Sequence, residues 1–151
     1  MTTVTAVEHW HNRDSQIGAT ARAQAKRTLA RHAITIDNRT RDNPAAIETI
    51  LRANPKYAAL SFIACVETAA KNWEIGNNSG DSRKLEESLR YCDRFQNAAE
   101  VVAALFGCTL SWPGLYPVLK DAGGAEHDGS SDMRSVFRAF TGNLPAEASP
   151  D

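Results

Sequence analysis

Two long alanine-rich segments with the spacing of amphipathic helices dominate the middle of this chain. They run from Tyr57 to Ile75 and from Leu85 to Phe106, and a short polar turn at 76–81 joins them. Apolar side chains recur every three or four residues in both, which places them on one face of an α-helix. Phe62 and Trp73 should contribute most by burial, at roughly 1.5–3 kcal/mol each. Because the turn is short, we predict an antiparallel helical pair at the centre of the fold.

Further helices are predicted on both sides of this pair. One should extend from about Ser15 to Ala33. The steps Asn43-Pro44 and Asn54-Pro55 mark two more helix starts, because Asn caps a helix well and Pro is tolerated at its first position. After the pair, Pro113 or Pro117 can open a short helix through Leu119.

The predicted fold class is mainly α, as one domain built as a helical bundle or an orthogonal array of five to six helices. The 151 residues fit one domain. A minor N-terminal β ribbon is also predicted, in which Thr2–Val7 pairs with Ala33–Ile36. We assign the domain to residues 1–142, with an internal flexible linker at 123–131 and a disordered tail at 143–151.

Charge is nearly balanced over the whole chain but unevenly distributed along it. The net charge is −1, which does not indicate a globally basic nucleic-acid binder. Residues 1–60 carry nine Lys or Arg against five Asp or Glu, whereas residues 61–151 carry eight against thirteen. One basic and one acidic end can orient a protein partner or a second copy of the chain.

The cysteines and the N-terminus predict a cytoplasmic protein that does not contact a membrane. Cys65, Cys92 and Cys108 are odd in number and widely spaced, which argues against a disulfide framework. The N-terminus lacks the basic and apolar regions of a secretory signal, and no apolar run has the ~18 residues of a membrane span. No motif indicates a cofactor.

A C-terminal apolar stripe is the main candidate for partner binding. Met133, Val136, Phe137 and Phe140 recur at i, i+3, i+4 and i+7 behind the predicted linker. A short amphipathic helix on such a tether suits a hydrophobic groove on a second copy or on another protein. The alternative is that this helix folds back onto its own domain.

A basic set near the N-terminus is the candidate for nucleic-acid binding, through contacts to phosphates. It comprises Arg22, Lys26, Arg27, Arg31, Arg39 and Arg41. The other interpretation is a solvated charged face on a helix whose opposite face packs.

His9 and His11 form the only close histidine pair and are weak candidates for metal binding. In an extended segment, alternate side chains point to the same side, so both imidazoles could bind one ion. A zinc site needs a third and usually a fourth ligand, and no spacing in the sequence supplies them. Otherwise these histidines are simply solvated.

Motifs for catalysis are missing from the sequence. There is no Gly-x-Ser-x-Gly elbow and no phosphate-binding loop, and neither Glu67 nor Glu100 starts a Glu-x-x-His pair. Our leading hypothesis is therefore a non-enzymatic protein-binding or regulatory module that self-associates. The alternatives are a nucleic-acid-associated protein that uses the basic helix, and a small metal-dependent enzyme centred on His-x-His.

Overall fold

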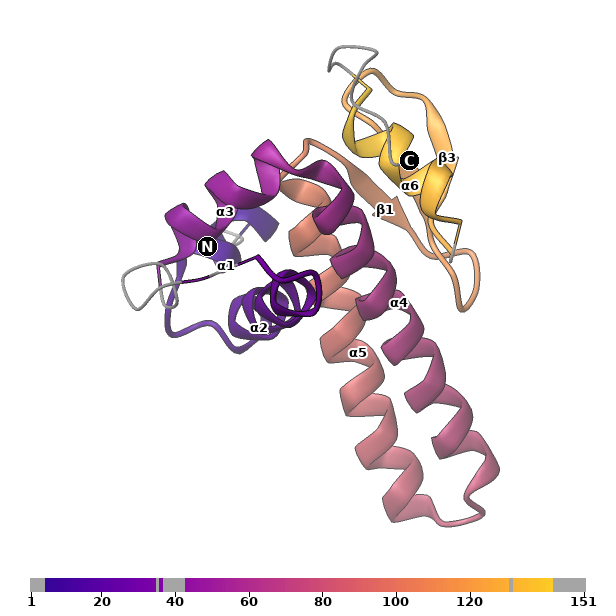
Figure 1. Ribbon diagram of the computed structural model, residues 1–151. Helices are drawn as coiled ribbons and strands as arrows, with labels where there is room; N and C mark the ends of the chain where they lie inside the picture. Colours follow the sequence, from indigo (N-terminus) through magenta and orange to yellow (C-terminus); the bar gives the residue numbers. More distant parts are fainter. Residues whose placement is uncertain (1–4, 35, 37–42, 131, 143–151) are drawn as a thin grey trace.

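The computed structural model describes residues 5–34, 36, 43–130 and 132–142, and these form six helices and a small three-stranded sheet (Figure 1). The helices are α1 Ala6–His11, α2 Gln16–Arg31, α3 Pro44–Ala53, α4 Pro55–Asn78, α5 Ser82–Ala104 and α6 Met133–Phe140. The strands are β1 Thr109–Ser111, β2 Val118–Lys120 and β3 Glu126–Asp128. The predicted fold class, mainly α with five to six helices, is confirmed, and the small sheet that accompanies the helices lies at 109–128. The predicted tail at 143–151 lies outside the described residues.

The antiparallel pair of α4 and α5 is the centre of the fold, as predicted (Figure 1). Side chains such as Phe62 and Val66 on α4 and Ala99 and Val102 on α5 are fully buried. The two helices approach closely near the turn. A Cβ added to Gly76 would lie only 2.9 Å from the Ser88 Cβ, which is why a glycine fits at this position inside a helix.

Local capping explains where most of the other helices begin. The Ser15 hydroxyl accepts a hydrogen bond from the Gly18 N–H at 3.1 Å, and the Asn43 side chain accepts one from the Ala46 N–H at 3.2 Å. Pro44 and Pro55 occupy first helical positions, as predicted. Asn54 differs from the expectation, because its side chain donates to the Ile50 carbonyl instead of capping α4.

The N-terminal segment is a helix, so the predicted β ribbon is wrong where the structure can be compared with it. Ala6 and Val7 belong to α1, while residues 1–4 and 35 lie outside the described part of the chain. The physical reason is a capping box. The Thr5 hydroxyl accepts from the Glu8 N–H, and the Glu8 carboxylate accepts from the Thr5 N–H.

The sheet follows α5 as an antiparallel meander in the order β1-β2-β3, with Leu110, Leu119 and His127 in register across it. The helix predicted through Leu119 is therefore wrong, because Leu119 lies on β2. The segment 123–131, predicted as a linker, contains β3. The Asp121 carboxylate closes the hairpin between these strands, since its Oδ1 accepts from the N–H groups of Gly123 and Ala125 at 2.9 Å each.

Asp121 also makes this hairpin sensitive to acid. Its Oδ2 lies 2.8 Å from His127 Nε2, and this bond, with those from the backbone of Ala125 and Gly123, lowers the pKa of Asp121. Because the pKa of Asp121 is lower in the folded than in the unfolded state, its carboxylate stabilises the fold at pH values above about 4, the unfolded-state pKa. This stabilisation is lost as the pH falls through the folded-state pKa.

We expect Asp121→Asn to be less stable than the wild type at pH 7, with a gap that narrows as pH falls below about 4. Urea unfolding at pH 7, 4 and 3 measures both stabilities. Asp14→Asn is the matched control, because the Asp14 carboxylate accepts no hydrogen bond from the described residues. A difference in stability that stays constant from pH 7 to pH 3 would contradict this role of Asp121.

Candidate protein-interaction surface

The predicted partner-binding stripe lies in the core of the chain itself. Val136 is fully buried, Phe137 and Phe140 are nearly so, and Met133 packs against the core from its edge. The Phe140 ring meets Phe62 of α4 edge-on at 5.7 Å. The amphipathic helix was correctly predicted, but α6 docks on its own domain, and a partner could reach the stripe only if α6 detached.

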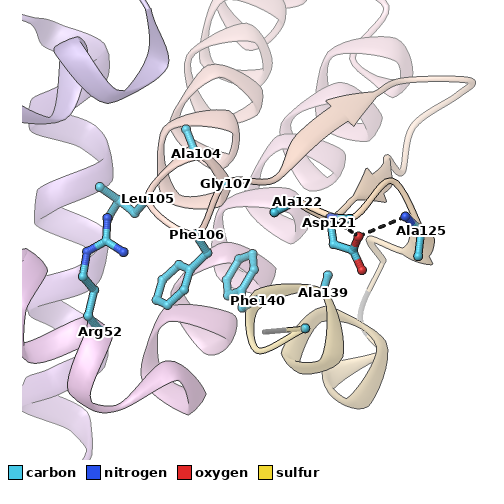
Figure 2. A pocket seen from close by; sticks show the side chains of 12 residues that line it. Arg52, Ala104, Leu105, Phe106, Gly107, Asp121, Ala122, Ala125, Ala139 and Phe140 are labelled. Carbon is cyan, nitrogen blue, oxygen red and sulfur yellow. Dashed lines mark hydrogen bonds between the residues drawn. The ribbon is translucent and has the colours of Figure 1, made fainter. Parts of the chain in front are cut away.

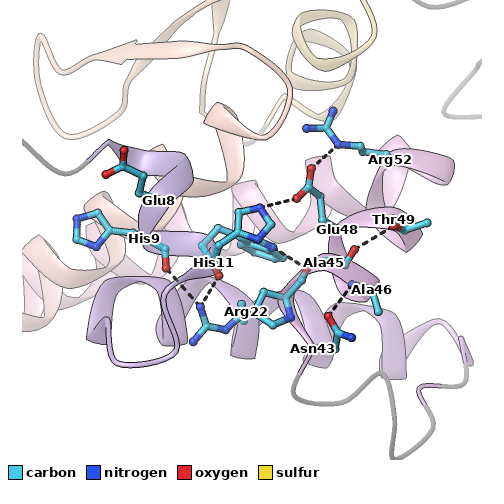
Figure 3. Close-up of polar contacts among 12 residues, drawn as sticks. Glu8, His9, His11, Arg22, Asn43, Ala45, Ala46, Glu48, Thr49 and Arg52 are labelled. Atoms are coloured by element: carbon cyan, nitrogen blue, oxygen red, sulfur yellow. Dashed lines mark hydrogen bonds and ion pairs between the residues drawn. The ribbon is translucent and has the colours of Figure 1, made fainter.

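The predicted basic set is divided by the structure. Arg22 is buried and donates from Nη1 to the carbonyls of His9, Trp10 and Asn12, at 3.3, 2.5 and 3.4 Å. Figure 3 shows the contact with His9. It therefore joins α1 to α2 and does not face a phosphate backbone. Arg27 and Arg31 are exposed on α2, and Lys26 is half-buried. Arg39 and Arg41 lie outside the described residues.

The geometry assumed for a metal at His9 and His11 is wrong, because both residues lie on α1 and not on an extended segment. Residues two apart on a helix point about 200° apart. His9 Nδ1 lies 2.6 Å from Ser15 Oγ. His11 Nε2 instead lies 2.9 Å from Glu48 Oε1 (Figure 3). Among the residues that the structure describes, no three His, Cys, Asp or Glu side chains gather as a metal site.

The cysteine thiols are protected from reaction by their surroundings. Burial raises the pKa of Cys65 and of Cys108 to about 12, so both stay protonated at neutral pH. Cys108 donates its S–H to the Ala139 carbonyl at 3.3 Å, which links the segment after α5 to α6. These side chains therefore act as core residues.

A surface that the sequence did not predict lies at the free end of the central pair. Figure 1 shows α4 and α5 projecting as a two-helix hairpin well beyond α2, α6 and the sheet. We call residues 71–91 the arm. Within the arm only Gly76 and Ser88 are buried. Helices in proteins gain most of their stability from packing, so this part of the hairpin has little to hold it in an isolated chain.

Large apolar side chains are exposed on this arm. Trp73 is 43% exposed, Ile75 and Leu89 are each 40% exposed, and Tyr91 is 41% exposed. In the described part of the chain, only Val7 and Tyr116 are further large hydrophobic residues with such exposure. Single exposed apolar residues are ordinary, but a cluster on one projecting element marks an interaction site.

One side of the arm, which we call the sheet side, continues the face that packs on the sheet and α6. On α5, Leu89 is followed at helical spacing by Asp93 and Glu100, and the Glu100 carboxylate accepts from Trp112 Nε1 beside β1. On α4, Trp73 continues the stripe of Phe62, whose ring contacts Phe140. The charged residues around Trp73 and Leu89 are mostly acidic: Glu74, Glu86 and Asp93, with Arg90 paired to Glu86.

The opposite side, which we call the α2 side, is mostly basic. Ile75 lies two residues after Trp73 on α4, so it points about 200° away from Trp73 and away from the sheet side. Tyr91 continues the stripe of the fully buried Ala98, and the Arg94 guanidinium lies 5.1 Å from the Tyr91 ring centroid. Along this side, two basic residues, Lys84 and Arg94, accompany one acidic residue, Glu87. The arm therefore combines an acidic apolar side with a basic apolar side.

Comparison with protein-family models, with curated proteins and with solved structures finds no match for this chain. Within its described residues, no helix has the length and apolar character needed to cross a membrane.

Proposed function

We propose that this chain is a non-enzymatic protein-binding module that self-associates through its arm. The observation that carries the proposal is the exposure of Trp73, Ile75, Leu89 and Tyr91 on a two-helix projection with almost no core of its own. Covering these side chains removes apolar area from water at roughly 25 cal/mol per Å² and supports the helices of the arm.

Charge complementarity favours a second copy of the chain as the partner. When the sheet side of one arm packs on the α2 side of another, Trp73 and Leu89 meet Ile75 and Tyr91. The acidic residues Glu74 and Glu86 then oppose Lys84 and Arg94. Two sheet sides would instead place acid against acid, which an interface disfavours. Four helices packed in this way form a bundle, a common arrangement for antiparallel hairpins.

A contact between two different sides has a consequence for the size of the assembly. Each copy still presents one unused side after pairing, so such contacts continue into a ring if the rotation closes and into an open filament if it does not. We therefore expect an assembly larger than a dimer.

The double variant Trp73→Ser, Leu89→Ser tests the surface. Losing a buried Trp at an interface commonly costs 2 kcal/mol or more, so we expect dissociation constants to rise by about 30-fold or more. Sedimentation velocity of the full chain over a range of concentrations measures this change. The matched control is Val7→Ser, Tyr116→Ser, which removes two exposed apolar residues away from the arm. A wild-type chain that stays monomeric, or a double variant with unchanged mass, would overturn the proposal.

Charge reversal tests the pairing of opposite sides. One variant carries Glu74→Lys and Glu86→Lys, and the other carries Lys84→Glu and Arg94→Glu. We expect each alone to lose association, because both of its sides then carry the same sign, and an equimolar mixture to recover it. If the second variant alone associates like the wild type, two sheet sides pair with each other and the predicted arrangement is wrong.

A further inference from the structure

A cavity of about 710 Å³ lies away from the arm, between the end of α5 and the β2–β3 turn (Figure 2). Arg52 of α3 borders it on one side and Asp121 on the other, with Phe106 and Phe140 between them. Its volume falls within the range of about 300–1,000 Å³ that is typical of small-molecule sites. Nothing in the proposed self-association uses this cavity.

The floor of the cavity is a pair of parallel rings. Phe106 and Phe140 stack with centroids 4.8 Å apart and planes 6° apart. Small residues make up much of the rest of the cavity's lining, notably Gly107, Ala122 and Gly142. A Cβ added to Gly142 would lie 3.4 Å from Asp121 Oδ2, in ordinary van der Waals contact. The cavity therefore suits a flat apolar group.

The two charged residues at the cavity differ in what they can still bind. Asp121 Oδ1 already accepts two backbone N–H groups, and its Oδ2 pairs with His127. Arg52 uses only its Nε, which lies 2.6 Å from Glu48 Oε2, while its Nη atoms donate to none of the described residues. Glu48 is held in turn by His11, and the guanidinium carbon of Arg52 lies 5.8 Å from the Phe106 ring centroid.

From this arrangement we infer that the cavity binds a small carboxylic acid with a flat apolar body. The carboxylate pairs with the free edge of the Arg52 guanidinium, whose planar fork matches two carboxylate oxygens. The apolar body lies against the Phe106 and Phe140 rings. Glu48 and Phe106 hold the guanidinium in place, so less of its freedom is lost when the acid binds.

Titration of the full chain with phenylacetate, followed by amide chemical shifts in ¹⁵N-labelled protein, tests the inference. We expect shifts centred on Gly107, Gly123 and Gly142, and affinity for phenylacetate at least tenfold above that for phenethylamine, which has the opposite charge. Arg52→Gln should weaken phenylacetate binding at least tenfold. Arg83→Gln, an exposed arginine on the arm, is the matched control and should not change it.

Three results would overturn the inference. One is the absence of chemical-shift changes at these glycines when phenylacetate is millimolar and in up to 20-fold excess over the protein. A specific site of this kind should bind with a dissociation constant of roughly 1 mM or lower. The second is equal binding of phenylacetate and phenethylamine. The third is equal binding by wild type and Arg52→Gln, which would place any contact away from the guanidinium. The arm variant Trp73→Ser, Leu89→Ser should bind phenylacetate like the wild type, so this test is separate from that of self-association.

Discussion

Replacing Trp10 by alanine should destabilise the protein by about 3–5 kcal/mol, the range found for large aromatic residues truncated in a core. Trp10 is fully buried, and its Nε1–H donates to the Pro44 carbonyl at 2.9 Å. Truncation leaves a cavity where α1 meets the core and also removes this hydrogen bond, which contributes about 0.5–1.5 kcal/mol, part of it included in the range above.

Urea unfolding at a protein concentration where the wild type is monomeric measures this loss, because association would otherwise add to the apparent stability. Trp73→Ala is the matched control. Trp73 is 43% exposed and lies on the arm, outside the core cluster, so its removal should destabilise the monomer by only about 1 kcal/mol. Trp10→Phe should fall between the two, since it keeps most of the volume and loses the hydrogen bond. Equal losses for Trp10→Ala and Trp73→Ala would contradict this assignment of the core.

Gly18→Ala should cost nearly as much, about 2–4 kcal/mol, although it adds only one methyl group. A Cβ at this position would lie 1.8 Å from the His9 carbonyl oxygen and 2.9 Å from Arg22 Nη1. The carbonyl belongs to the backbone and cannot rotate away, so α1 would have to separate from α2. That separation would also break the hydrogen bonds from Arg22 to α1.

Gly114→Ala is the control for this substitution, since a Cβ at Gly114 meets no atom within 4 Å. We expect its midpoint of thermal unfolding to match that of the wild type, while Gly18→Ala unfolds at a temperature lower by about 4–16 °C. If alanine is tolerated equally well at both positions, α1 does not pack as closely on α2 as the structure indicates.

The helical elements could be predicted from the sequence because their signals are local. The apolar spacing of α4 and α5 and the two Asn-Pro steps each involve residues within a few turns of one another. The same local logic also misled the prediction at the N-terminus. The alternation of hydroxyl and apolar residues before Glu8 resembles a strand, but Thr5 and Glu8 form a capping box.

The sheet could not be predicted because strands of three residues depend on partners elsewhere in the chain. The sequence Glu126-His127-Asp128 has no apolar residue and looks like a linker. It becomes a strand because Asp121 closes the turn and His127 pairs with that same carboxylate. Neither contact has a sequence signature that separates it from an ordinary polar loop.

The candidate surface was missed for a related reason. Helical periodicity identifies which residues share a face but not what covers that face. Periodicity alone assigned Trp73 to the core and the stripe of Val136 and Phe140 to a partner. The structure leaves Trp73 partly exposed and buries Val136 and Phe140, because α4 is longer than the body that packs on it while α6 docks on that body.

The close approach at Gly76 and Ser88 gives the arm a further property. Where two helices touch through such small residues, the distance between their axes depends on single methyl groups. In a ring built from neighbouring arms, that distance would set the angle between successive copies. Enlarging Gly76 should therefore change the number of subunits in the ring while leaving each body folded, so the stoichiometry would be encoded at one position near the tip.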